Sequence, residues 1–381
     1  MSYASEGAPR AVASSRGGGA CDASNRDDRA GGTEQGAGKS ASRGQNQRLC
    51  ELRPDKVSAA APVTEVSAGP GARVGFIVGP TGAGKTALAL AVAERLGAEI
   101  VNADSRQVYR GMDVGTAKPT AAEQARVPHH LIDIRTPDDP LDVAEFAALA
   151  KAAIAEVTAR GRPVLIVGGS GLYLRVLRDG IFAGPPAAPA IRAELTAFAR
   201  RRGTPALHIK LAAVDSAAAA RISPNDLQRI VRALEVFRLT GTPLSAHHER
   251  HRFATPPYAS LTVGVTMPRE LLYATIDRRF AAMVAAGLLD EVRGLLADGH
   301  QTGDTRLGTI GYRELAAHLR GATDLPTAIA NAQRASRQLA KRQLTWFRAD
   351  PAIVWLDART ALEPAFKLFR DFFDRQKDSD G

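Results

Sequence analysis

The feature that most constrains this chain is a glycine-rich motif between an apolar run, 74–78, and a helix-forming stretch, 87–96. The motif consists of Gly79, Pro80, Thr81, Gly82, Ala83, Gly84, Lys85 and Thr86, and it matches G-x-x-x-x-G-K-[ST] at every position. In such a loop, backbone N–H groups and the start of the following helix converge on phosphate oxygens. Lys85 would add a positive charge, and Thr86 would offer a hydroxyl to Mg²⁺. The motif therefore predicts a phosphate-binding loop between a strand and a helix.

Short apolar runs alternate with helical patterns along the chain. Strands are expected at 74–78, 100–103, 131–134, 163–167 and 261–265, with a last edge strand at 353–356. The main helices are expected at 87–96, 142–159, 271–296 and 328–347. This alternation predicts an α/β fold, in which a P-loop-containing parallel sheet carries helices on both faces.

Composition and pattern divide the chain into five parts. The first 72 residues are rich in Gly, Ala, Ser and Arg and lack a hydrophobic period, so they cannot bury enough apolar surface to fold. After residue 182 the pattern becomes mainly helical, with helices expected at 191–202, 216–222 and 226–239. The predicted parts are a disordered extension 1–72, a first core part 73–182, an inserted helical subdomain 183–260, a second core part 261–370 and a frayed C-terminus 371–381.

The charge of the chain favours an anionic partner. The formal net charge is +10, of which +9 belongs to residues 73–381. Nucleic acid, a nucleotide or an acidic membrane would suit this charge, although solubility alone could account for it. Both cysteines, Cys21 and Cys50, precede the core, which excludes cysteine-ligated zinc there. Without a secretory pattern or a long apolar run, we expect a cytoplasmic protein with no membrane partner.

Two absent motifs narrow what the phosphate loop does. A GTPase would need Asn-Lys-x-Asp to read guanine, and the chain does not contain it. A motor-type ATPase would need an apolar strand that ends in Asp or Asp-Glu, but the run 163–167 ends in Gly168-Gly169. Repeated nucleotide hydrolysis is therefore disfavoured, and small-molecule kinases and other group transferases remain.

Polar residues follow two of the expected strands. Asp104 ends the strand at 100–103, beside the loop and at the edge where α/β proteins bind ligands. Its carboxylate could take a proton from a nucleophile that attacks next to the phosphate, or it could be a helix cap. The position beside the loop favours the base. In the turn 168–171, the Ser170 hydroxyl and the N–H groups could bind an anionic oxygen or simply close a tight turn.

Two helices carry closely spaced basic residues. Arg229 and Arg232 occupy neighbouring turns of one helix, which suits phosphate contacts. Pairing of Arg232 with Glu235 on a solvated face would give the same pattern. The second helix carries Arg337, Lys341, Arg342 and Arg348, with the same two interpretations. Together with the charge of the core, these helices indicate that the anionic partner is RNA.

The longer motifs resemble those of the bacterial tRNA dimethylallyltransferases, also called tRNA isopentenyltransferases. The matching stretches are 79–86, 104–119, 168–173, 225–235, 310–312 and 337–343. The phosphate loop occurs in many families, whereas the stretch 104–119 is specific to this one. Serine stands at position 170, where the family usually has threonine, and arginine at 106, where it often has alanine. The hydroxyl at 170 is kept, so we expect its role to be kept.

The resemblance implies a monomeric transferase that uses Mg²⁺. It would move a dimethylallyl group from dimethylallyl diphosphate to N6 of adenosine 37, in tRNAs that read codons beginning with U. The loop 79–86 would hold the departing diphosphate, Asp104 would take the proton of the amine, and the catalytic set would include Lys85, Thr86 and Ser170. The implied tRNA contacts are Asp104, Ser105, Arg106, Gln107, Ser170, Arg192, Gln228, Arg229, Ile230, Val231 and Arg232.

Three other functions fit parts of the sequence. A prenyltransferase acting on free adenine nucleotides would use the same loop, but it would not need the basic helices after residue 183. A P-loop small-molecule or nucleotide kinase would use the same loop together with Asp104. A non-catalytic RNA-binding protein would have no need of the intact loop.

Overall fold

The core of the protein is a parallel sheet. A computed structural model describes residues 72–180, 184–251, 256–300 and 307–374, so the expected extension lies outside it apart from Ala72. The strands are β1 (Arg73–Val78), β2 (Glu99–Asn102), β3 (His129–His130), β4 (Val164–Gly168), β5 (Ala259–Thr266) and β6 (Val354–Asp357). They form one sheet in the order β3-β2-β4-β1-β5-β6, with every pair parallel. β6 is an edge strand, as predicted.

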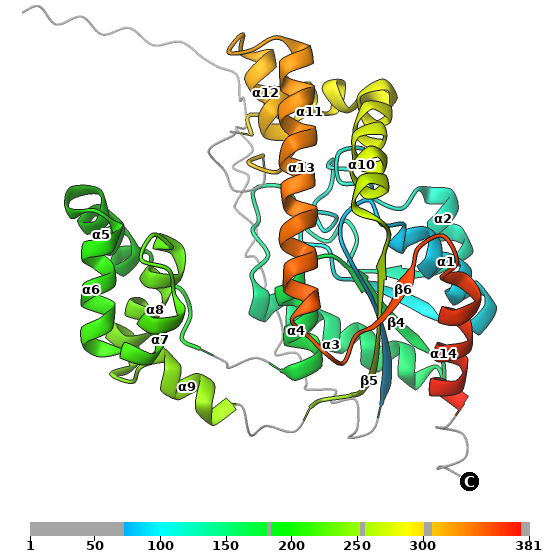
Figure 1. Ribbon diagram of the computed structural model, residues 1–381, viewed down its shortest axis with the longest axis horizontal. Coiled ribbons are helices and arrows are strands. Elements are labelled where there is room, and N and C mark those ends of the chain that lie inside the picture. The colour runs from blue at the N-terminus through cyan, green and yellow to red at the C-terminus, as the bar shows by residue number, and fades with distance from the viewer. Residues whose placement is uncertain (1–71, 181–183, 252–255, 301–306, 375–381) are drawn as a thin grey trace, which may run out of the picture. The chain divides into compact units, whose positions relative to one another are not determined.

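Helices connect the strands and cover both faces of the sheet (Figure 1). Those of the first core part are α1 (Lys85–Leu96), α2 (Ala121–Arg126), α3 (Val143–Ala159) and α4 (Gly171–Asp179). The middle of the chain forms α5 (Pro189–Arg202), α6 (Thr204–Val214), α7 (Ser216–Arg221), α8 (Leu227–Thr240) and α9 (Leu244–His251). The last part contains α10 (Arg269–Met283), a π-helical turn η1 (Val284–Leu288), α11 (Leu289–Ala297), α12 (Tyr312–Leu319), α13 (Leu325–Arg348) and α14 (Leu362–Asp374).

The sheet is buried on both faces, which explains why its strands are almost continuously apolar. Side chains alternate along β1: Phe76 packs in a cluster with residues of α3 and α13, whereas Ile77 packs in a second cluster with residues of α1 and α14. α1 and α14 also contact each other (Figure 1). The predicted α/β class is therefore confirmed.

Two expected elements are wrong in detail. The strand expected at 131–134 lies earlier, at His129–His130, because Leu131 and Asp133 have φ of 62° and 55°, which a strand does not allow. The long helix expected at 271–296 is divided into α10, η1 and α11. Gly287, with φ of 100°, interrupts the helical backbone there.

Two predicted limits also need correction. β5 begins at Ala259, so the expected boundary at residue 260 falls inside a strand. The C-terminus does not fray from 371, because α14 continues to Asp374 and buries Phe369 and Phe373. The rest of that expected segment, 375–381, lies outside the described residues. α2, α6, α9, α12 and α14 were not predicted at all.

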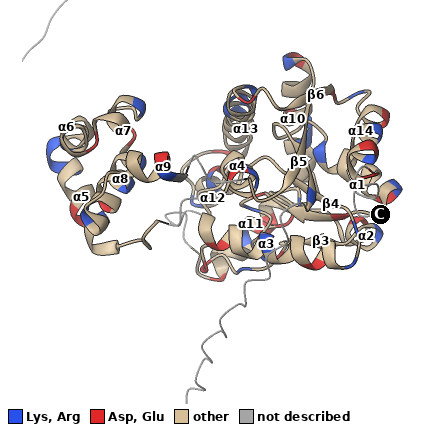
Figure 2. Ribbon diagram, turned by 90° about the horizontal axis from the view of Figure 1, so that it is seen from below, with Lys and Arg blue, Asp and Glu red and all other residues tan. Residues whose placement is uncertain are grey.

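Helices α5 to α9 have a hydrophobic core of their own. Leu207, Leu211 and Ile230 are fully buried in it, and every member of this cluster lies between residues 191 and 244. Residues 189–251 carry ten Lys or Arg and five Asp or Glu, a net charge of +5. Figure 2 shows basic residues on α5. A helix long and apolar enough to cross a bilayer does not occur among the described residues.

Candidate active site

A cavity of about 120 Å³ lies at the carboxyl edge of the sheet. It is formed where the segments after β1, β2 and β4 meet, which is the edge where open α/β sheets bind ligands. Its lining includes Thr81, Lys85, Thr86, Asn102, Asp104, Gln107, Thr116, Ala117, Pro119, His129, Gly168, Gly169, Arg279 and Gln343. The structure thus brings together Lys85, Thr86 and Asp104, which the sequence pointed to separately.

The phosphate loop joins β1 to α1, as predicted. Gly79 has a φ of 147°, and a Cβ there would lie 2.4 Å from the carbonyl oxygen of Val265 on β5, so only glycine fits. Gly84 begins α1 with a φ of 83°. The Lys85 Nζ donates to the Pro80 carbonyl at 2.9 Å, which folds the lysine back over its own loop. The loop therefore has a fixed backbone between β1 and α1, while its binding of a phosphate stays a prediction.

A glutamine from α13 ties the phosphate loop to the second glycine turn. The Thr81 N–H donates to Gln343 Oε1 at 2.8 Å, and Gln343 Nε2 donates to the Gly169 carbonyl at 2.9 Å. Gln343 was recognised only as part of a motif, because nothing in the local sequence distinguishes it from a surface glutamine. Its amide fixes the spacing between the two glycine turns.

Two cationic side chains converge on the cavity. Burial lowers the pKa of Lys85 to about 8, with Asp104 opposing the shift and Arg279 adding to it. Burial also lowers the pKa of Arg279, and its Nη2 donates to Thr81 Oγ1 at 2.6 Å. Two cations held close together, with Asp104 as the one carboxylate that lines the same cavity, favour a ligand with more than one negative charge. The sequence did not reveal Arg279, which lies in an amphipathic helix without a motif.

Asp104 is held in a fixed orientation at the end of β2. The Arg106 N–H donates to Asp104 Oδ1 at 2.8 Å, and the Asp104 N–H donates to Asn102 Oδ1 at 3.1 Å. Its charge also raises the pKa of Lys85, so the two groups are electrostatic neighbours across the cavity. A half-buried carboxylate in this position is placed to accept a proton beside a bound anion.

Ser170 connects the two strand-end loops. Its Oγ accepts from the Ser105 N–H at 3.1 Å and donates to Ser105 Oγ at 3.4 Å. It does not cap α4 with its side chain, because the hydroxyl is turned towards Ser105. Ser105, Arg106 and Ser170 therefore surround Asp104, whereas their predicted roles in catalysis or tRNA binding stay predictions.

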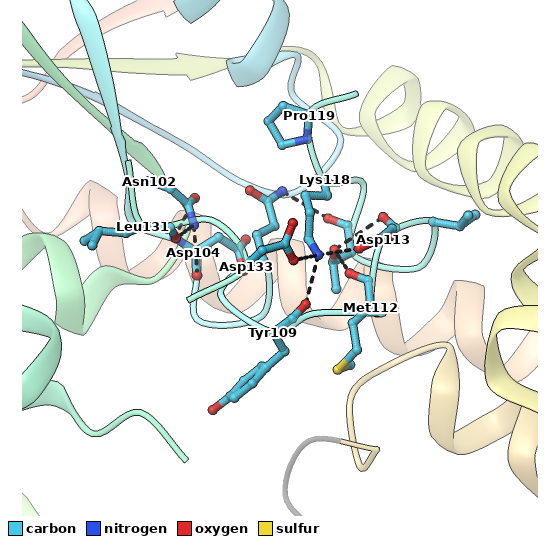
Figure 3. Close-up of polar contacts among 12 residues, drawn as sticks. Asn102, Asp104, Tyr109, Met112, Asp113, Lys118, Pro119, Leu131 and Asp133 are labelled. Atoms are coloured by element: carbon cyan, nitrogen blue, oxygen red, sulfur yellow. Dashed lines mark hydrogen bonds and ion pairs between the residues drawn. The ribbon is translucent and has the colours of Figure 1, made fainter. Parts of the chain in front are cut away.

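The stretch 104–119 is an ordered loop closed around one lysine (Figure 3). Lys118 is almost fully buried, and its Nζ donates to Asp113, to Asp133 and, at 2.8 Å, to the Tyr109 carbonyl. Gln107 Nε2 donates to the carbonyls of Thr116 and Ala117 at 3.1 and 3.0 Å. Ala117 takes a φ of 52°, an uncommon value for alanine that persists only where the surroundings impose it.

In the helical part, two predicted tRNA contacts share one buried carboxylate. Glu235 is fully buried and accepts from Arg192 Nε at 2.7 Å, from Arg232 Nη1 at 2.7 Å and from the Ala188 N–H at 2.7 Å. Burial alone would raise the pKa of Glu235, but these bonds lower it to about 2. The expected pairing of Arg232 with Glu235 is therefore present, but Glu235 is buried instead of lying on a solvated face, and both guanidiniums keep partly exposed faces.

The other predicted contacts on α8 divide into two groups. Ile230 and Val231 have side chains buried in the helical core, and a role for these residues in tRNA contact stays a prediction. Gln228 is exposed, and Arg229 is 64% exposed while it pairs with Asp226 at 3.3 Å. The helical period places these two residues on the outer face.

The second basic helix, α13, is also partly engaged within the protein. Arg337 donates twice to Asp277 of α10, at 2.5 and 2.6 Å, so its charge is neutralised between the two helices. Lys341 and Arg342 line a groove on the exposed side of α13. No group of three or more His, Cys, Asp or Glu side chains suited to a metal ion occurs within the described ranges.

Fold and site together define a phosphate-loop transferase, with two cations on one side of its cavity and a fixed carboxylate beside them. The model of the IPP transferase family matches residues 107–350, and the chain belongs to this family. A tRNA dimethylallyltransferase of Geobacter metallireducens is 53% identical over 285 residues, which cover 75% of this chain and 92% of the relative.

Solved structures lead to the same family. The tRNA isopentenylpyrophosphate transferase of Bacillus halodurans superimposes with a TM-score of 0.60 at 39% identity, covering 81% of this chain and 99% of that one. A eukaryotic dimethylallyltransferase, crystallised while acting on tRNA, superimposes with a TM-score of 0.70 at 25% identity, covering 80% of each chain.

Proposed function

We propose that the protein transfers a dimethylallyl group from dimethylallyl diphosphate to N6 of adenosine 37 in tRNA. The products are N6-dimethylallyladenosine and diphosphate, and the tRNAs are those that read codons beginning with U. One observation carries the proposal: Lys85 and Arg279 face Asp104 across a single cavity, in a chain of this family. The cations suit the diphosphate, and the carboxylate suits the amine.

The proposed reaction forms one C–N bond and breaks one C–O bond. As the allylic carbon leaves diphosphate it gains cationic character, and the N6 amine attacks it. Asp104 accepts the proton that the amine loses, while Lys85 and Arg279 balance the negative charge that grows on the leaving oxygen. The adenine must leave its stack to enter the cavity, as bases do in other enzymes that modify them.

The residues of the cavity also fit Mg²⁺. Thr86 offers a hydroxyl, and it lines the cavity beside the phosphate loop. Mg²⁺ in such sites takes one or two protein oxygens together with phosphate oxygens and water. When bound, it would stabilise the charge of the departing diphosphate.

For tRNA recognition we propose the loop 105–107, Ser170, and the outer faces of the helical part through Arg192, Gln228, Arg229 and Arg232. The net charge of +5 on residues 189–251 supports a role for these helices in holding the phosphate backbone. We further propose that the protein acts as a monomer in the cytoplasm, where its substrate tRNA is found.

A transfer assay tests the proposal. The protein is incubated with Mg²⁺, labelled dimethylallyl diphosphate and unmodified tRNA that carries A36-A37-A38, and we expect label at N6 of A37. A tRNA with G37 serves as the matched control and should stay unlabelled. Equal labelling of free AMP, or phosphoryl transfer from ATP instead of prenyl transfer, would replace this function by one of the alternatives.

Binding of tRNA should weaken steeply as salt rises. Each phosphate contact released contributes roughly 0.7–0.9 to the slope of log K against log salt, so the affinity should fall markedly between roughly 50 and 200 mM salt. Arg229→Gln should lower that slope by about 1. Arg370→Gln is the control, because Arg370 on α14 is also exposed and paired with a neighbouring aspartate. An unchanged slope in Arg229→Gln would remove this residue from the RNA surface.

A further inference from the structure

The loop 104–119 is held from outside by one carboxylate. Glu291, on α11, accepts from the backbone N–H groups of Asp113 at 2.9 Å and Val114 at 2.7 Å through Oε2. Through Oε1 it accepts from the Gly115 N–H at 3.1 Å and from the Tyr312 hydroxyl at 2.5 Å. Three consecutive backbone N–H groups that point to one anion form a nest. Here the occupant of the nest is a side chain from a helix that lies 176 residues further along the chain.

Tyr312 closes the nest from behind. Its side chain is fully buried, and burial followed by the nearby Glu291 carboxylate raises its pKa, so its hydroxyl stays protonated and donates. A Cβ at Gly115 would lie 2.5 Å from the Tyr312 ring and 2.7 Å from Leu288, so the backbone can approach only because residue 115 is glycine. This packing accounts for the motif Ile310–Tyr312, for which the chemistry of the cavity has no other use.

The nest leads directly to the cavity. Its next residues, Thr116 and Ala117, line the cavity, and their carbonyls accept both bonds from Gln107 Nε2. Those carbonyls can accept from both amide hydrogens of Gln107. The Gln107 side-chain oxygen is then the atom that can accept a hydrogen bond from the N6 amine of the substrate. Gln107 follows Asp104 and Arg106 in the same loop, so a shift of the nest would displace the side chains that surround the reacting nitrogen.

We propose that Glu291, supported by Tyr312, is a positioning residue for prenyl transfer: it fixes the segment 113–117 and, through it, the Gln107 amide at the cavity. This inference rests on the function proposed above. A carboxylate is needed because its two oxygens supply about four acceptor sites, and all four donors use them. An amide at this position has one oxygen with two acceptor sites, so two of the four donors would lose their partner.

The test is a split between turnover and binding in Glu291→Gln. We expect kcat to fall roughly 10- to 100-fold, because small misplacements of reacting groups are costly. The Kd values for tRNA and for dimethylallyl diphosphate should stay within about threefold, because Glu291 does not line the cavity. Tyr312→Phe removes one donor only and should lower kcat about fivefold. Glu291→Asp keeps the charge and should recover part of the loss.

Glu99→Gln is the matched control. Glu99 is another buried carboxylate, but it lies at the amino end of β2, where it accepts from His130 and Arg160, away from the cavity. We expect it to lower Tm and leave kcat unchanged. Amide hydrogen exchange gives a second readout: residues 113–117 should exchange faster in Glu291→Gln and at the wild-type rate in Glu99→Gln.

Three outcomes separate the possibilities. If Glu291→Gln lowers Tm as Glu99→Gln does and keeps kcat, Glu291 only stabilises the fold and the inference is overturned. A loss confined to one Kd would also overturn it, because Glu291 would then act in binding. If the wild-type protein transfers no label to tRNA, the proposed function fails, whereas the exchange at 113–117 would still report whether the nest depends on Glu291. Should Glu291→Gln not fold, Glu291→Asp and Tyr312→Phe carry the same comparison.

Discussion

Asp104→Asn should abolish most turnover while tRNA binding stays nearly intact. We expect kcat to fall roughly 10²- to 10⁴-fold, the range that general bases contribute, because no other carboxylate lines the described cavity. Asparagine keeps the Oδ1 that accepts from the Arg106 N–H, so the loop geometry should survive. Asp104→Ala removes that acceptor as well and should add a loss of loop order. Single-turnover rates at saturating tRNA measure the chemical step directly.

Asp138→Asn is the control for this prediction. Asp138 is 69% exposed and pairs with His300 outside the cavity, so its loss should leave turnover unchanged. If Asp104→Asn instead weakens tRNA binding while kcat at saturation is kept, Asp104 is a recognition residue and the base must be sought elsewhere. A second consequence follows from electrostatics: because Asp104 raises the pKa of Lys85, its removal should lower that pKa below 8.

Affinity for dimethylallyl diphosphate should fall as the pH rises above about 8. In the free protein, burial lowers the pKa of Lys85 to about 8, so the ammonium begins to lose its proton there. A bound diphosphate raises this pKa again, which means that binding takes up a proton in the window above pH 8. Linkage then weakens the affinity by up to tenfold per pH unit in that window. Below pH 8 Lys85 is charged in both states and contributes no change.

Two substitutions of Lys85 separate the contribution of its charge to diphosphate binding from the contribution of its side-chain shape. Lys85→Met should weaken diphosphate binding by about a hundredfold, the worth of a charge-assisted contact of about 3 kcal/mol, and should remove the dependence above pH 8. Lys85→Arg should bind less well than wild type but with a flat response, because a guanidinium keeps its proton. Lys151→Met, on the exposed side of α3, is the control. Calorimetry at pH 7 and 9.5 in two buffers measures the proton uptake; an uptake of zero in the wild type would contradict the assignment.

Local patterns predicted those parts of the site that depend on neighbours in sequence. The loop 79–86 needs a strand before it and a helix after it, and both are visible as apolar and helical runs, so its place at the sheet edge could be predicted. The same holds for Asp104 and Ser170, which follow apolar strands. Parallel strands bring their carboxyl ends together, and this is why three separate turns meet at one cavity.

The remaining contributors come from helices, and of these residues only Gln343 belongs to a matching motif, 337–343. Arg279, Glu291 and Gln343 occupy positions whose roles depend on how α10, α11 and α13 pack over the sheet, and helical periodicity says only that they are near a polar face. The burial of the Ile230 and Val231 side chains was not visible in the motif for a related reason: the motif covers consecutive residues, whereas successive positions on a helix face different ways. The strand expected at 131–134 was wrong because an apolar run in the sequence does not reveal that two of its residues have positive φ.

The central place of β1 has a consequence for synthesis of the chain. β1 is made before any other strand, yet its neighbours in the sheet are β4, at residues 164–168, and β5, at residues 259–266. During translation, the backbone hydrogen bonds of β1 cannot be completed until β4 and β5 have both been synthesised. The hydrogen bond from the Thr81 N–H to Gln343 forms even later, because Gln343 must first leave the ribosome. A nascent chain therefore lacks a finished diphosphate site until nearly its whole length has been made, and folding of this core is a late event governed by distant contacts.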